Sequence, residues 1–312
     1  MDIKLTNMLN LGGENMNEDM LYDKVDFIAD HEGDEKAYKF LIENKENVEN
    51  PTAYLDFDVF RMAAKLNHNE DALKYMEESI IHKKLWYSGH IFNYDVFKNI
   101  SDTNRFKACR ELSEQRYNEF MKDSDAYYSW KSKSVDKLKV FVHGDSGNLG
   151  ISKEQWKFLN NEGYQVEYVV SKYPWTINHF RWMDDAKPQL PSVFKRMDGE
   201  SYKEVILYGF SAGPNEILKS ILVKPDICNK IFLVTPWLAI TTTHGEELAE
   251  KIAEQNIEVI MYCSKVFEEE MEMMNDFEKL LIDKGVKVKT IRSEDETCEF
   301  PQNPEEIFKG LI

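Results

Sequence analysis

The sequence predicts an α/β protein, in which a doubly wound, mostly parallel β-sheet follows an N-terminal α-helical domain. Two observations predict this class. From Lys133 onward, apolar segments with many β-branched residues alternate with helical segments, as in a parallel sheet with helices on both faces. Before that point, the apolar residues recur at helical spacing. We therefore expect a helical domain over 1–131 and an α/β domain over 132–312.

The helical region repeats itself with an offset of 35 residues. "ADHEGDEKAYKFL" aligns with "AKLNHNEDALKYM", which places Ala37 opposite Ala72 and Phe40 opposite Tyr75. The offset is close to the period of tetratricopeptide repeats, in which small residues let paired helices approach closely. The Trp and Gly positions of that repeat are not matched. We predict tetratricopeptide-like helical hairpins, whose surface could bind a protein partner.

The second domain contains six segments with the apolar character of buried strands. These segments are 137–143, 164–171, 204–209, 230–235, 257–263 and 286–291. The helices expected between and after them are 152–161, 188–197, 212–223, 245–255 and 267–284, with a last one after residue 304. Because binding sites in open α/β sheets form at the carboxyl ends of the strands, the loops after the strands are where a site is expected.

The stretch "EVILYGFSAGPNEILKS" reads as a strand, a tight turn and a helix, with Ser211 at the centre of a G-x-S-x-G motif. This arrangement is a nucleophile elbow, in which small neighbours tolerate a strained backbone and the serine hydroxyl is exposed. The next residue, Ala212, would offer its backbone N–H to an oxyanion at the start of the helix. The motif predicts Ser211 as a nucleophile on a backbone conformation outside the usual regions.

The first predicted strand ends in "VHGDSGNLG", a glycine-rich loop at the same edge of the sheet. Such a loop can present a second oxyanion N–H, and we assign this role to Gly144, Asp145 and Ser146, with the donor on Asp145 or Ser146. The loop has neither the dinucleotide spacing nor a Walker lysine, so phosphate binding is not indicated. We expect His143 to have a structural, hydrogen-bonded role.

Composition excludes several classes of partner. The formal net charge is −17 and no basic cluster occurs, which argues against nucleic acid or anionic membranes as partners. No signal peptide or membrane-spanning run is visible, so we expect a cytoplasmic protein. The four cysteines, Cys109, Cys228, Cys263 and Cys298, are scattered, which indicates reduced thiols, no metal site and no cofactor.

These motifs, taken in order, resemble those of bacterial α/β-hydrolases of the carboxylesterase, phospholipase and dienelactone-hydrolase type. That family includes members with a tetratricopeptide-like N-terminal region. The resemblance is carried by "HGDSGN", "EQWKFLNNEGYQV", "RWMDD" and "GFSAG", and in the helical region by "ALKYMEESIIHKKLWY" and "DTNRFKACRELSEQ". It implies an α/β-hydrolase fold and an esterase-like site for a small acyl-ester-like ligand.

The same resemblance shows where the chain departs from the family. The family's triad acid follows a strand that matches "MYCSKVFEEE", and the acid position falls on Val266. The family's triad histidine follows the last strand, and its position falls on Cys298 in "CEFP". No histidine follows His244 in the sequence. Because neither valine nor a thiol activates a serine as imidazole does, ester hydrolysis should be weak or rerouted.

The sequence leaves three interpretations open. In the first, a relocated base such as His244 or His179 serves Ser211, oriented by Glu268 or by a carboxylate of 294–296. In the second, the chain is a non-catalytic relative, a pseudo-hydrolase that binds a ligand or a protein. In the third, the thiol at the histidine position is a packed side chain with no role.

Overall fold

The structure, a computed structural model, describes residues 17–49, 51–128, 135–197, 201–294 and 299–311. The chain divides into two compact units. Unit 1 contains Met1–Asp123 and Pro174–His179, and unit 2 contains Ser124–Tyr173 and Phe180–Ile312. The predicted boundary between 131 and 132 lies outside the described residues, and the helical unit also takes a short segment from the second half of the chain.

Unit 1 is helical. Its α-helices are α2 (Glu18–Glu32), α3 (Asp34–Asn44), α4 (Ala53–Lys65), α5 (Asn69–Glu77) and α6 (Asn104–Met121). Shorter helical turns are η1 (Lys45–Asn47), η2 (Glu78–His82), η3 (Gly89–Asn93) and η4 (Asp95–Phe97). Side-chain caps begin three of the helices, since Asn17, Thr52 and Thr103 each accept a backbone N–H at the start of α2, α4 and α6.

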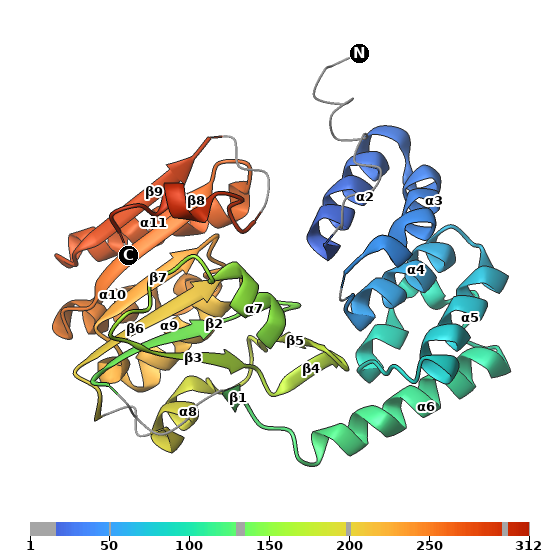
Figure 1. Cartoon of the computed structure of the whole chain (residues 1–312), viewed down its shortest axis with the longest axis horizontal. Coiled ribbons are helices and arrows are strands. Elements are labelled where there is room, and N and C mark those ends of the chain that lie inside the picture. The colour runs from blue at the N-terminus through green and yellow to red at the C-terminus, as the bar shows by residue number, and fades with distance from the viewer. Residues whose placement is uncertain (1–16, 50, 129–134, 198–200, 295–298, 312) are drawn as a thin grey trace. The chain divides into compact units, whose positions relative to one another are not determined.

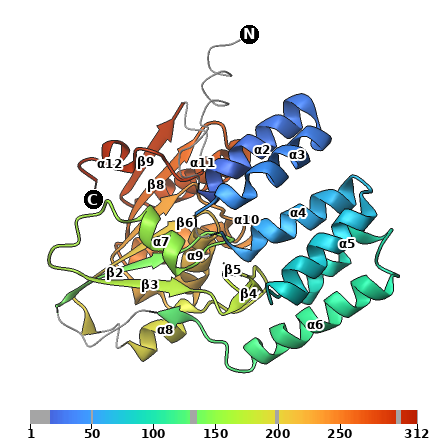
Figure 2. The same cartoon turned by 45° about the vertical axis from the view of Figure 1, so that its right-hand side comes forward.

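The sequence repeat corresponds to two helix pairs. The helix α2 packs against α3, and α4 packs against α5 (Figure 2). Ala37 and Ala72 are each the fourth residue of the second helix in their pair, and both are fully buried. The prediction that these alanines occupy equivalent packing positions is therefore confirmed. A side chain no larger than a methyl group at these positions lets the helices approach closely.

Unit 2 is built on a seven-stranded sheet, shown in Figure 1. The strands are β1 (Tyr127–Tyr128), β2 (Lys137–Val142), β3 (Gln165–Val170), β6 (Glu204–Phe210), β7 (Lys230–Val234), β8 (Glu258–Ser264) and β9 (Val288–Ser293). Their order is β1-β3-β2-β6-β7-β8-β9. All neighbouring strands are parallel except β1, which runs antiparallel to β3. The six strands expected from the sequence are all present.

The short strands were not predicted from the sequence. Besides β1, these are the hairpin strands β4 (Tyr173–Thr176) and β5 (His179–Arg181), which form a separate two-stranded sheet. Neither strand has a long apolar run, and β4 contains a proline, which usually argues against a strand. The tip of this hairpin is the segment that belongs to unit 1.

Helices cover both faces of the large sheet. They are α7 (Leu149–Gln155), α8 (Leu190–Arg196), α9 (Gly213–Val223), α10 (Thr241–Glu254), α11 (Glu268–Asp283) and α12 (Pro304–Ile307), with the turn η6 (Pro225–Ile227). Alternate residues of each strand enter different cores. Val205 and Leu207 of β6 join the core with α8 to α11, whereas Ile206 and Tyr208 join the core around Trp156. Burial on both faces explains why the strands read as unbroken apolar runs.

Among the described residues, no helix combines the length and the apolar character that crossing a bilayer requires.

Candidate active site

The turn between β6 and α9 has the geometry of a nucleophile elbow. Ser211 follows the last residue of β6 and has a φ of +52°, a left-handed conformation that is rare for a residue with a side chain. Hydrogen bonds hold both its backbone N–H and its carbonyl group. The Ser211 N–H donates to the Val234 carbonyl at 3.0 Å, and the Ser211 carbonyl accepts from the Trp237 N–H at 2.8 Å. The predicted backbone strain at Ser211 is confirmed.

The two glycines of the motif are required by close packing. A Cβ atom on Gly213 would lie 2.5 Å from the carbonyl oxygen of Val142. A Cβ atom on Gly209 would lie 2.8 Å from the backbone nitrogen of Pro214. Both distances are to backbone atoms, which cannot move aside as a flexible side chain can. The spacing of the motif therefore reflects how closely α9 and the end of β2 approach the elbow.

The glycine-rich loop after β2 lies directly against the elbow. A Cβ atom on Gly144 would lie 2.9 Å from the Cβ of Ser211 and 2.8 Å from the ring of Phe210. Within the described chain, the backbone N–H groups of Asp145, Ser146 and Ala212 donate to no protein acceptor. An oxyanion site needs backbone N–H donors of this kind, which lie beside a serine and have no acceptor within the protein.

His143 is a structural residue, as the sequence analysis expected. Its side chain is fully buried, its Nδ1–H donates to the Gly144 carbonyl, and its Nε2 accepts the Ser171 N–H at 3.1 Å. Burial lowers the pKa of His143 to about 4, so the ring is neutral at physiological pH. A neutral ring with one donor and one acceptor matches both of its partners.

The sequence resemblance assigns the position of the triad acid to Val266, which is not a carboxylate. Val266 lies in the turn between β8 and α11, and 48% of its surface is exposed. The residue at the family's glycine position, Cys263, is buried in β8, where its thiol contacts the Ser264 carbonyl. Burial raises the pKa of that thiol to about 12. Neither side chain can orient an imidazole as a carboxylate does.

Cys298 lies outside the described residues, but the residues that follow it approach the elbow. The Glu299 carbonyl accepts a hydrogen bond from the Thr235 hydroxyl, just after β7. The ring of Phe300 packs edge-on against the ring of Phe210, with centroids 5.3 Å apart. Phe210 precedes Ser211, so Glu299 and Phe300 lie near the elbow.

The two candidate bases, His244 and His179, contact residues other than Ser211. His244 is exposed near the start of α10, where its Nδ1 lies 3.3 Å from an oxygen of Glu247 on the same helix. His179 is buried on β5 in unit 1, and its ring lies 4.7 Å from Tyr54 and 5.9 Å from Trp175. His179 thus lies on a strand of the small hairpin and not on a loop. Among the described residues, no side chain forms a hydrogen bond with the Ser211 hydroxyl.

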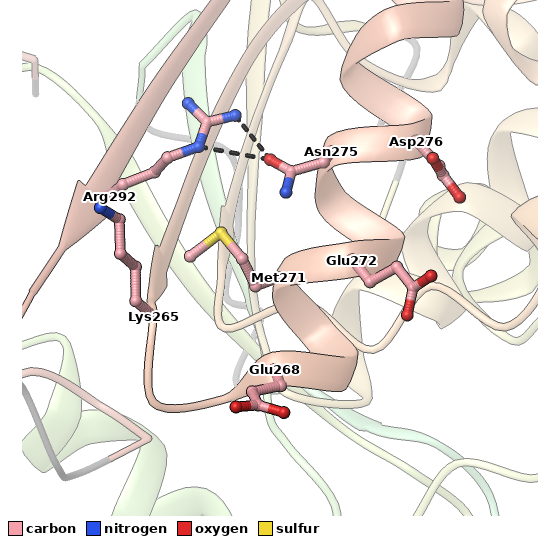
Figure 3. A pocket seen from close by; sticks show the side chains of 7 residues that line it. All are labelled: Lys265, Glu268, Met271, Glu272, Asn275, Asp276 and Arg292. Carbon is pink, nitrogen blue, oxygen red and sulfur yellow. Dashed lines mark hydrogen bonds between the residues drawn. The ribbon is translucent and has the colours of Figure 1, made fainter.

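The carboxylates proposed to orient a base also have other partners or surroundings. Glu294 pairs with Lys265 at 2.6 Å, and 295–296 lie outside the described residues. Glu268 opens onto a surface groove of about 610 Å³ beside α11 (Figure 3). The groove is lined by Lys265, Glu268, Met271, Glu272, Asn275, Asp276 and Arg292. Arg292 is bound to Asn275, and both cations of the groove are thus already partnered.

A buried polar network near the elbow was not predicted. Glu216, one turn into α9, accepts the backbone N–H groups of Gln189 and Leu190 at the start of α8. The side chain of Gln189 donates to Ser171, which also contacts His143. Burial raises the pKa of Glu216 to about 7. A glutamate in an apolar helix gives no sequence signal for such a role, because its partners are distant in the chain.

The first comparison concerns unit 1. Residues 18–121 match the family model described as "A/B hydrolase-like, N-terminal domain". Unit 2 supplies the parallel sheet, the elbow and the loop. The chain has an α/β-hydrolase fold. The description of the matched model does not mention tetratricopeptide repeats, so the tetratricopeptide-like character of the helical region is not confirmed.

Solved structures give more distant similarities, and no curated protein matches the chain. An uncharacterized protein from Bacillus cereus ATCC 10987 is 25% identical, with 94% of this chain and 98% of that chain covered and a TM-score of 0.48. Est1E from Butyrivibrio proteoclasticus, solved with ferulic acid, is 12% identical over 60% and 92% of the two chains, with a TM-score of 0.42. Zea mays acyl-protein thioesterase 2 is 13% identical over 60% and 97%, with a TM-score of 0.42.

Proposed function

We propose that this α/β-hydrolase carries an esterase-like site for a small acyl ester, with Ser211 as nucleophile and with weak or rerouted hydrolysis. One observation supports this proposal most. Ser211 has a strained backbone directly against the loop after β2, and the N–H groups of Asp145, Ser146 and Ala212 have no acceptor among the described residues. Strained conformations of this kind persist where the surrounding structure fixes them, and they cluster at active sites.

The chemistry would follow the usual order of acyl transfer. The Ser211 oxygen attacks the acyl carbon, its proton must leave, and the carbonyl oxygen becomes an oxyanion. The N–H groups of Ala212 and of Asp145 or Ser146 would stabilise this charge. The alkoxide then departs with a proton, and water releases the acyl group. With Val266 and Cys298 at the family's acid and histidine positions, the proton transfers have no efficient base.

The alternative is a non-catalytic relative that binds an ester-like ligand or a protein. Two observations favour it. The acid position is an exposed valine, and His244 pairs with a glutamate of its own helix. Losing the base of a serine triad costs on the order of a million-fold in turnover, and a protein with such a loss can be retained for binding alone.

A fluorophosphonate probe separates the two proposals, because it reacts readily only with an activated serine. We expect slow but measurable labelling of the wild-type protein, and its loss in Ser211→Ala. Ser101→Ala is the matched control, since Ser101 bonds the Lys98 carbonyl in unit 1. Absence of labelling at high probe concentration would support the binding relative. Labelling that persists in Ser211→Ala would exclude Ser211 as the nucleophile.

A further inference from the structure

Trp182 holds the loop after β2 by two hydrogen bonds, one from its backbone N–H and one from its indole. The Trp182 backbone N–H donates to a carboxylate oxygen of Asp145 at 3.1 Å. Its ring Nε1–H donates to the His143 carbonyl at 2.7 Å. Trp182 is only 5% exposed, so the second bond is made away from water. One residue therefore binds the loop on both sides of Gly144.

Stacking adds a third contact. The rings of Trp182 and His143 lie 4.9 Å apart with an interplanar angle of 29°. His143 is itself fixed by Gly144 and by the N–H of Ser171. The position after the loop is also held, because the Phe180 N–H donates to the Gly147 carbonyl at 3.1 Å. The segment around Trp182 thus holds the loop at several points.

The opposite side of the loop meets the elbow. Gly144 approaches Phe210 and Ser211 so closely that it has no room for a side chain. The loop therefore lies between Trp182 and the nucleophile, and the direction of its N–H groups depends on both contacts. A shift of the loop away from Trp182 would move the Asp145 and Ser146 donors relative to Ser211.

We propose that Trp182 is a positioning residue that fixes the oxyanion donors of the loop opposite Ser211. The inference rests on the proposed function for its catalytic part, whereas the holding of the loop itself does not. The key group is the indole N–H. Without it, the buried His143 carbonyl lacks its donor, and an unsatisfied buried group costs enough to favour loop conformations that reach water. Oxyanion donors act only when they are held in place before the reaction.

The variant Trp182→Phe tests this role, because it keeps an aromatic ring against His143 and removes the N–H. We expect amide hydrogen exchange in 144–148 to become about tenfold faster, as the loss of one buried hydrogen bond implies. Trp86→Phe is the matched control, since Trp86 is equally buried in unit 1. It should leave exchange in the loop unchanged. Unchanged exchange in Trp182→Phe would overturn the proposal.

The second readout is the rate of fluorophosphonate labelling at Ser211. We expect Trp182→Phe to slow it about tenfold, and any ester turnover to lose kcat with KM unchanged, because the oxyanion forms only in the transition state. Faster exchange with unchanged labelling would contradict the positioning role and leave Trp182 purely structural. A wild-type protein that the probe never labels would contradict the proposed function, and hydrogen exchange alone would then decide whether Trp182 holds the loop.

A second variant tests the same contact if Trp182→Phe does not fold. Asp145→Ala removes the acceptor of the Trp182 backbone N–H. Because Asp145 is exposed, this substitution does not disturb the core. The backbone N–H of residue 145 remains. Loop exchange should rise in this variant as well, by a smaller factor than in Trp182→Phe. No change in either variant would exclude Trp182 as the residue that fixes the loop.

Discussion

The two halves of the candidate site differ in how they are built. The nucleophile half consists of the elbow and the loop after β2, and close backbone packing fixes it at Gly144, Gly209 and Gly213. The partner half consists of Val266 and Cys298, the positions that the sequence resemblance assigns to the acid and the histidine. The first half has the geometry of a nucleophile elbow beside a glycine-rich loop, whereas the residues that the resemblance assigns to the second half are neither a carboxylate nor an imidazole.

This difference shows at which positions of a site a substitution also harms folding. Replacing a glycine of the elbow would push a side chain into the backbone, so such a change harms folding as well as activity. A substitution at an exposed turn position such as Val266 would leave the sheet and its cores intact. A chain can therefore lose catalytic side chains in exposed loops and still keep the elbow, because the elbow glycines are needed for folding.

The largest effect should come from restoring the partner half. Val266→Asp combined with Cys298→His should raise p-nitrophenyl acetate turnover by about a thousandfold, within the range of general acid–base catalysis. Each single substitution should do much less, because members of a triad act as a unit. Turnover is measured for both single variants and the pair, each also in a Ser211→Ala background. Equal rates in the single and double variants would mean that these positions do not form the partner half.

A smaller effect is expected from disturbing the nucleophile half. Gly213→Ala would place a Cβ 2.5 Å from the Val142 carbonyl oxygen and should lower the free energy of unfolding by about 3 kcal/mol. Gly150→Ala is the control, because its Cβ would meet only the side chain of Asn148 at 3.2 Å. Urea unfolding measures both. If Gly213→Ala were as stable as Gly150→Ala, the packing explanation of the motif would be wrong.

The smallest effect concerns the buried carboxyl below the elbow. Because the folded pKa of Glu216 is about 7, above that of an unfolded glutamate, the folded state keeps a proton that the unfolded chain releases. Wild-type stability should therefore fall as the pH rises from about 4.5 to about 7. Glu216→Gln keeps an acceptor oxygen and removes this titration. Relative to wild type, it should gain about 2 kcal/mol between pH 5 and pH 8.

Chemical unfolding at several pH values checks this prediction, with Glu154→Gln as the control. Glu154 is an exposed carboxylate that pairs with Lys157, so its removal should not change the slope. Parallel curves for wild type and Glu216→Gln would show that Glu216 is ionised in the folded state across this range.

Much of the fold could be predicted because it depends on local patterns. Strands buried on both faces read as apolar runs, and the elbow is visible because Gly209 and Gly213 have no room for side chains. The contacts of Trp182 with 143–145 could not be predicted, since they join residues almost forty positions apart. The strand position of His179 could not be predicted, because a short hairpin with a proline gives no strand pattern.

The most direct test of the contrast between the two halves is ester turnover by the unmodified protein. We predict very slow hydrolysis of p-nitrophenyl acetate that depends on Ser211 and is unchanged in His244→Ala and His179→Ala. Correct folding of each variant is checked by its thermal unfolding. Rapid hydrolysis that Ser211→Ala abolishes, and that His244→Ala or His179→Ala abolishes as well, would contradict this contrast and show that a relocated base completes the site.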